Sequence, residues 1–241
     1  MLHRTKGIVL HSIKYSESSI IVKIYTEIFG LQSYLVKAIR GPKSKMKPGL
    51  FQPLNLLELV VYHREKKTLQ SIKEIQLGHP YHTIPFDIRK SSVALFINEL
   101  LYKSIREEES NSALFEHLWN ACMSLDSEQE SVGSFHLVFM VQLTHFLGIM
   151  PQLNFSVQEP FFNVPEGHFQ SHRPDHNIYL DAELSKELYS ILKTPIEQQS
   201  SIKVKPAIRN QLLETLIFYY KTHLPGFKGL QSHMVLHTVL S

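Results

Sequence analysis

Three lysines recur at every second position in one segment of this chain, and this spacing would let their side chains bind a ligand together. Between Arg40 and Gly49, the side chains of Lys43, Lys45 and Lys47 alternate with other residues, and no acid interrupts them. In an extended chain, alternate side chains project to one side about 7 Å apart, which is close to the phosphate spacing of a nucleic-acid strand. The chemistry would be electrostatic binding of a polyanion. The alternative is a solvated hairpin loop, in which lysine is an ordinary residue.

Positive charge is concentrated in the first third of the chain, which also contains these lysines. Residues 1–80 hold 13 Lys and Arg against 5 Asp and Glu, whereas residues 81–241 hold 12 against 17. This asymmetry indicates that the first part meets a polyanion, of which nucleic acid is the first to consider, although a basic module with an unused solvated face stays possible. The cations expected to contact nucleic acid are Lys14, Lys23, Lys37, Arg40, Lys43, Lys45 and Lys47.

Three tyrosines of the same region could add base stacking. If they face outward, a base can lie against the ring, because every base has a π-face. If they face inward, they belong to the core or the rim of the fold. The three are Tyr15, Tyr25 and Tyr34.

The elements that must position these residues are β-strands. Apolar and polar residues alternate with period two, and β-branched and aromatic residues are frequent, which predicts strands near 6–14, 19–28, 32–40, 53–63 and 67–76. Five strands with short connections suit a small closed barrel. The OB-fold is the expected form, and a small SH3-like barrel is the competing one.

From about residue 80 the pattern becomes helical. His79-Pro80 and Ile84-Pro85 mark the junction, and Asp87 is placed to cap a helix with apolar positions spaced three and four apart. The segment near 132–147 is apolar nearly all round, which is typical of the buried centre of a bundle. We therefore predict an α+β chain with a five-stranded OB-fold barrel over 1–79 and an all-helical C-terminal domain over 80–241. That domain carries an irregular, cysteine-free insert at about 150–181.

Signatures of catalysis and of metal binding are missing. The lysine segment lacks the ending of a phosphate-binding P-loop, and no nucleophile elbow is present. His168, His172 and His176 are spaced by four, but Gly167 and Pro174 argue against the helix that would bring the imidazoles together. We expect no catalytic residue, no metal site and no cofactor.

The cellular compartment follows from equally simple observations. The single cysteine, Cys122, cannot form an internal disulfide, which favours a reducing compartment. The start MLHRTKGIVL has no apolar core of signal-peptide length, and no segment is long enough to span a bilayer. The expectation is a soluble cytoplasmic protein without a membrane partner.

Several short motifs resemble, in order, those of the RecO family of bacterial recombination mediators. The resemblance is dense over about 6–76 and weaker through Phe146-Leu147-Gly148, Pro151 and the final helix. The motifs are Lys6-Gly7-Ile8-Val9-Leu10, Tyr15-Ser16-Glu17-Ser18, Ile21-Val22 with Tyr25-Thr26, Lys37-Ala38 with Arg40-Gly41, Lys43-Ser44-Lys45, and Gln52-Pro53-Leu54 with Leu56-Leu57-Glu58-Leu59.

The resemblance implies an N-terminal OB-fold, a helical domain and no catalysis. It implies binding of single- and double-stranded DNA, annealing of complementary strands, and help for RecA in replacing single-strand DNA-binding protein. The implied protein partners are RecR and the C-terminal tail of single-strand DNA-binding protein, with RecA involved indirectly. The cations that match the family's basic loop are Lys37, Arg40, Lys43, Lys45 and Lys47. An RNA-binding OB module and a protein adaptor without nucleic-acid affinity remain as alternatives.

One departure from the family concerns zinc. Many relatives carry a four-cysteine zinc module after the helix that ends near Gly148, but residues 151–180 hold no cysteine here. Zinc is therefore not carried over. We expect apolar packing to hold this segment together instead, through Phe155, Phe161, Phe162 and Val164.

Overall fold

The chain forms two compact units in a computed structural model that describes residues 1–37, 46–129 and 131–240. The first unit comprises Met1–Thr83 with Asn98–Asp126, and the second comprises Ile84–Ile97 with Ser127–Ser241. The domain boundary drawn from the sequence between residues 79 and 80 stays a prediction.

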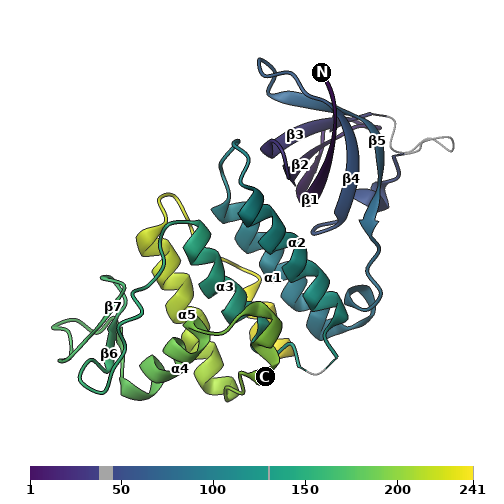
Figure 1. The fold of residues 1–241 in the computed structure, drawn as a ribbon. Coiled ribbons are helices and arrows are strands. Elements are labelled where there is room, and N and C mark those ends of the chain that lie inside the picture. Colours follow the sequence, from purple (N-terminus) through teal and green to yellow (C-terminus); the bar gives the residue numbers. More distant parts are fainter. Residues whose placement is uncertain (38–45, 130, 241) are drawn as a thin grey trace. The chain divides into compact units, whose positions relative to one another are not determined.

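Five strands of the first unit close into a barrel in the order β1-β2-β3-β5-β4 (Figure 1). β3 and β5 are parallel, whereas β1 pairs antiparallel with both β2 and β4. The closed barrel, with this strand order and the parallel pairing of β3 with β5, confirms the five-stranded OB-fold barrel in place of the SH3-like alternative. The strands are β1 (Leu2–Lys14), β2 (Ile20–Thr26), β3 (Gly30–Val36), β4 (Leu56–Tyr62) and β5 (Leu69–His79).

The barrel core follows the period-two pattern of the sequence. Val22 and Ile24 are fully buried in β2, whereas Lys23 between them is only half-buried. Phe51, from the 3₁₀ helix Pro48–Phe51, joins the same core. The remaining buried members are Val9, Tyr34, Val36, Leu57, Leu59, Val61 and Ile72.

Helical residues from Asn98 onward cover part of the barrel wall. They belong to α1 (Ile88–Ser104) and α2 (Ser112–Ser127). The Asn98 amide donates to the Leu10 carbonyl at 3.1 Å, and the Phe115 ring stacks on Tyr25 with centroids 6.2 Å apart. These contacts place residues 98–126 in the same compact unit as the strands.

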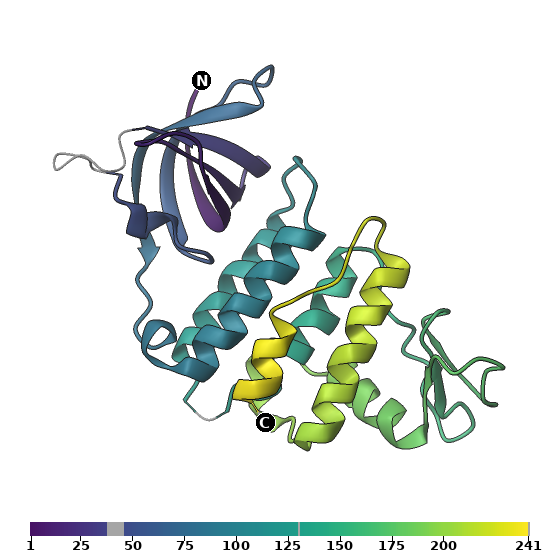
Figure 2. The ribbon, with the colours of Figure 1, turned by 180° about the vertical axis from the view of Figure 1, so that it is seen from behind.

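The second unit is a helical assembly around α3 (Phe135–Phe146) (Figure 2). This helix is buried on nearly every side, as its composition predicted, and it packs against α4 (Ala182–Leu192), α5 (Pro206–His223) and the 3₁₀ helix Ile196–Ser201. The unit begins with the 3₁₀ helix Ile84–Phe86 and the capped start of α1, and it ends with α6 (His233–Val239). The predicted cap is confirmed, because the Asp87 carboxylate accepts from the Arg89 backbone N–H at 2.8 Å.

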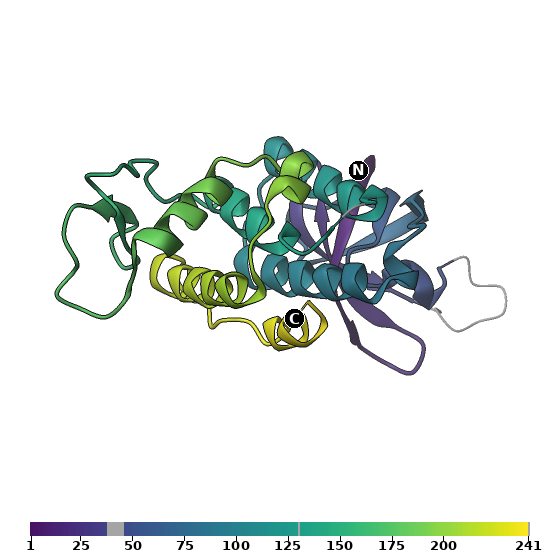
Figure 3. The same ribbon diagram turned by 90° about the horizontal axis from the view of Figure 1, so that it is seen from below.

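A small three-stranded sheet occupies the segment that was expected to be irregular (Figure 3). Its strands are β6 (Phe161–Asn163), β7 (His168–Gln170) and β8 (Tyr179–Leu180), and β6 packs against α4. The C-terminal domain was predicted to be all-helical, and this sheet is where the structure differs from that prediction. The expected aromatic packing is confirmed, because Phe162 is buried with its ring centroid 4.8 Å from that of Phe169, and Phe155 lies 5.1 Å from the Tyr189 ring.

Candidate nucleic-acid interface

An open groove lies on the barrel wall between β3 and β5, and the described residues that line it include three lysines and no carboxylate. We call it the lysine groove. Its volume is about 720 Å³. Lys37 directly follows β3, and Lys66 and Lys67 belong to the loop between β4 and β5. The complete lining is Leu35, Lys37, Met46, Lys66, Lys67, Thr68, Leu69, Gln70, Ser71 and Ile72.

Parallel pairing of β3 and β5 sets the length of the lysine groove. Tyr34 lies beside Gln70 in the register. Lys37 is therefore displaced toward one end of the groove, and Lys67 toward the other. Each lysine lies just beyond its strand, so at about 3.3 Å per residue the two are up to roughly 20 Å apart in the strand direction, enough to contact different phosphates of one nucleic-acid strand.

The β4–β5 loop is held in place by the buried side chain of Gln70. The Gln70 amide oxygen accepts from the Arg64 N–H at 2.9 Å, and its amide nitrogen donates to the carbonyls of Arg64 at 3.0 Å and Lys67 at 2.7 Å. The Lys67 N–H also donates to the Arg64 carbonyl at 3.0 Å. The backbone groups of Arg64 and Lys67 are thus paired on either side of Lys66. The exposed Glu65 lies between Arg64 and Lys66.

Sequence reasoning did not select the lysines of this loop. The sequence did offer one indication of them, because Arg64, Lys66 and Lys67 place three cations within four residues of the loop after β4. What the sequence could not show was the parallel pairing of β3 with β5, which puts this loop and Lys37 on one groove.

The cations selected from the sequence separate into three groups. Lys14, Lys37 and Lys47 are exposed, and Lys14 lies at the same end of the barrel as Lys37, since Lys14 pairs with Ile20 and Ile20 with Val36. Lys23 is half-buried, and its Nζ lies 5.5 Å from the centroid of the Tyr102 ring. The predictions for Arg40, Lys43 and Lys45 lie outside the described residues.

No ion pair neutralises the exposed cations within the part of the chain that the structure describes. Lys14, Lys37, Lys47, Lys66 and Lys67 form no salt bridge with a described carboxylate. No described ion pair therefore offsets the charge of these lysines, and like charges gathered in one groove favour an anionic ligand.

The three tyrosines differ in exposure, which corrects two of the stacking predictions. Tyr15 is 61% exposed, but Tyr25 is 1% and Tyr34 0% exposed. Tyr34 points into the barrel core because it has the same strand parity as Val36, and Tyr25 is covered by Phe115 from α2. Burial raises the pKa of Tyr25 to about 12 and raises that of Tyr34 as well. Neither of these two rings is accessible to a base.

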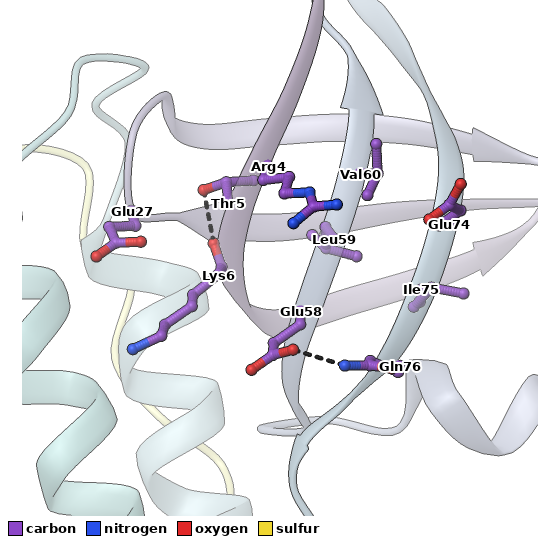
Figure 4. A pocket seen from close by; sticks show the side chains of 10 residues that line it. All are labelled: Arg4, Thr5, Lys6, Glu27, Glu58, Leu59, Val60, Glu74, Ile75 and Gln76. Atoms are coloured by element: carbon purple, nitrogen blue, oxygen red, sulfur yellow. Dashed lines mark hydrogen bonds between the residues drawn. The ribbon is translucent and has the colours of Figure 1, made fainter.

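A second hollow on the barrel has a different electrostatic character (Figure 4). It lies over β1, β4 and β5, has a volume of about 460 Å³, and mixes the cations Arg4 and Lys6 with three carboxylates, those of Glu27, Glu58 and Glu74. The Lys6 ammonium also lies 5.2 Å from the Trp119 ring centroid. Because carboxylates repel phosphates, the lysine groove is the better candidate interface.

Metal-binding or nucleophilic groups do not assemble around the described part of the chain. Within residues 1–37, 46–129 and 131–240, no group of three or more His, Cys, Asp or Glu side chains could hold a metal ion. Burial raises the pKa of the Cys122 thiol to about 12, so its reactive thiolate form is disfavoured at neutral pH. Across the same residues, every helix is too short or too polar to span a bilayer.

The fold and the groove together define a class, that of OB-fold proteins with a cationic groove on the barrel wall. Two family models match the chain: Recombination protein O N terminal over residues 1–81 and Recombination protein O C terminal over residues 85–231. The chain belongs to the RecO family of DNA repair proteins.

Curated relatives match the chain along its full length. A DNA repair protein RecO from Phocaeicola vulgatus is 37% identical over 241 residues, covering 100% of both chains. The proteins of the same name from Flavobacterium psychrophilum and Bacteroides fragilis are each 38% identical, covering 99% and 98% of both chains, respectively. The likeness therefore includes the insert without cysteines as well as the barrel.

Proposed function

We propose that this chain is a recombination mediator that binds DNA and performs no covalent chemistry of its own. In this proposal it binds single- and double-stranded DNA, anneals complementary strands, and helps a recombinase of the RecA type to load onto DNA coated with single-strand DNA-binding protein. RecR and the C-terminal tail of single-strand DNA-binding protein are the proposed protein partners. The place of action is the cytoplasm.

The observation that carries the proposal is the lysine groove. Among the described residues that line it are three exposed lysines and no carboxylate. The apolar side chains of Leu35, Met46, Leu69 and Ile72 form part of its wall. Lysine binds phosphate as a point charge without demanding one geometry. Such a surface supports binding that depends on the backbone and little on the base sequence, as a mediator requires.

Annealing follows from the same electrostatics. Two complementary strands repel each other through their phosphates, and cations that neutralise some of these phosphates lower this repulsion. The contacts must also release the product duplex, which isolated lysine–phosphate contacts on an open groove permit. Arg40, Lys43 and Lys45 are proposed as further contacts of this kind, together with the exposed Lys14 and Lys47.

Strand annealing with fluorescent oligonucleotides tests the proposal. Complementary DNA strands are mixed with the full chain, either bare or coated with the cognate single-strand DNA-binding protein, with and without the C-terminal tail of the coating protein. We expect faster annealing of bare and coated strands, and loss of the effect on coated strands when the tail is removed.

Parallel binding measurements with RNA of the same sequence distinguish the alternatives. Tighter binding to RNA than to DNA, read through the 2′-hydroxyls, would support an RNA-binding module. Absence of binding to either polymer would contradict the proposal and leave a protein adaptor.

A further inference from the structure

An exposed tyrosine lies at the end of β4, directly before the loop that carries the groove lysines. Tyr62 is 46% exposed, and its neighbour across the β1–β4 pairing, Leu2, is 48% exposed. A single exposed aromatic residue is ordinary on a protein surface. The position of Tyr62 is what distinguishes it, because its neighbour on the other side is Ser71 of β5, which lines the lysine groove.

The outward direction of Tyr62 follows from the residues on either side of it. Val61 is fully buried in the barrel core, so the next side chain of the strand points outward. The His63 ring lies flat on Phe29 with centroids 3.8 Å apart, and the His3 ring meets the edge of Phe29 at 5.1 Å. The residues flanking Tyr62 are thus fixed by packing.

The backbone around Tyr62 is also anchored. The His63 N–H donates to the Met1 carbonyl at 3.0 Å, which extends the β1–β4 pairing past Tyr62. On the other side, the Gln70 side chain holds Arg64 and Lys67. Ser71 is small and exposed, so the β5 side chain beside Tyr62 leaves the ring open toward the groove.

We propose that Tyr62 is a base-stacking residue that favours single-stranded over duplex DNA. An unpaired base of a strand whose phosphates contact Lys66 and Lys67 would lie on the tyrosine ring, with Leu2 extending the apolar surface. The bases of a duplex are already stacked on each other and cannot use the ring. This inference rests on the proposed DNA binding and adds the group that distinguishes the two forms of DNA.

Three ligands of equal length test the role of the ring: an oligothymidine, an abasic strand with the same phosphates, and a duplex. We expect Tyr62→Ala to weaken oligothymidine binding by about 5- to 150-fold, the range for loss of one stacked base, and to change the other two affinities by less than about twofold. Tyr62→Phe should bind all three ligands like the unmodified chain, because the Tyr62 hydroxyl forms no hydrogen bond with a described residue.

Controls separate stacking from general surface effects. Phe86→Ala removes an aromatic side chain that is 86% exposed and lies outside the barrel, and it should alter none of the three affinities. An unfolding midpoint close to that of the unmodified chain shows that Tyr62→Ala still folds. An equal loss on all three ligands, or no loss on oligothymidine, would overturn the role of Tyr62 while leaving DNA binding intact. If the unmodified chain binds none of the ligands, the proposed function fails as well.

Discussion

Tyrosines of this barrel differ in exposure according to the face of the strand on which each side chain lies. Tyr34 of β3 and Tyr62 of β4 lie on either side of β5 in the same closed sheet, yet the first is buried in the core and the second is half exposed. Tyr15 is exposed because it follows the end of β1. Composition therefore identifies aromatic residues near the lysines. Which of them a base could reach depends on the face of the strand that each occupies and on whether another element packs over it.

At the same scale, one buried histidine should make stability depend on pH. His136 is 1% exposed, its Nδ1 has no partner among the described residues, and its ring meets the edge of Phe96 at 5.8 Å. Burial, followed by the charges of Arg209 and His237, lowers the pKa of His136 from 6.5 to about 3. Below pH 6.5 the unfolded imidazole binds a proton that the folded one does not, so stability is lost as the pH falls from about 6.5 toward 3.

Urea unfolding at a series of pH values measures this effect. Between pH 6 and 4, the free energy of unfolding should fall by roughly 1.4 kcal/mol per pH unit more in the unmodified chain than in His136→Gln. His172→Gln, at an exposed position, should keep the full slope. Equal slopes for the unmodified chain and His136→Gln would show that His136 is not held neutral.

At the scale of elements, the β2–β3 turn depends on a glycine next to the acidic loop between α1 and α2. Gly30 has φ of +60°, and the Leu31 N–H donates to the Glu107 carbonyl at 3.1 Å. A Cβ on Gly30 would collide with the Glu109 carbonyl group. The side chains of the acidic run, Glu107 to Glu109, are exposed, so it is the backbone of this loop that contacts the turn.

Replacing this glycine should therefore be costly. Gly30→Ala should lower the free energy of unfolding by about 2–4 kcal/mol, since the left-handed conformation and the backbone collision both oppose a side chain. Gly49→Ala is the matched control, because a Cβ there meets nothing within 4 Å, and its effect should stay within about 1 kcal/mol. Urea unfolding of the two variants measures the difference, and similar values for both would contradict this account of the turn.

The elements that sequence analysis identified are those with a long periodic signal. The five strands, the capped start of α1 and the buried helix α3 all follow from residue patterns of seven residues or more. β6, β7 and β8 have two or three residues each, too few for a period to be visible. The lysine groove was missed in part, since Lys37 and Lys67 are 30 residues apart in the chain and come to line one groove through a strand pairing that no local pattern records.

At the scale of the whole molecule, part of the positive charge that the sequence concentrates in its first 80 residues lies in one groove of the barrel. The first 80 residues carry a net charge of +8, and within them the groove between β3 and β5 concentrates lysines, whereas the hollow over β1, β4 and β5 is lined by both signs of charge. Membership of a DNA repair family and this cationic groove support the same ligand. The central claim is that phosphates of DNA bind in the lysine groove.

The salt dependence of binding to a single-stranded oligonucleotide tests that claim most directly. The logarithm of the affinity falls with the logarithm of the salt concentration by about 0.7 for each phosphate neutralised on a single strand. The combined variant Lys37→Ala, Lys66→Ala and Lys67→Ala should therefore flatten the slope by about 2. The control variant Lys186→Ala, Lys203→Ala and Lys228→Ala removes the same charge from exposed positions outside the first unit, and it should leave the slope unchanged. Identical slopes for the two triple variants would contradict the assignment of the groove.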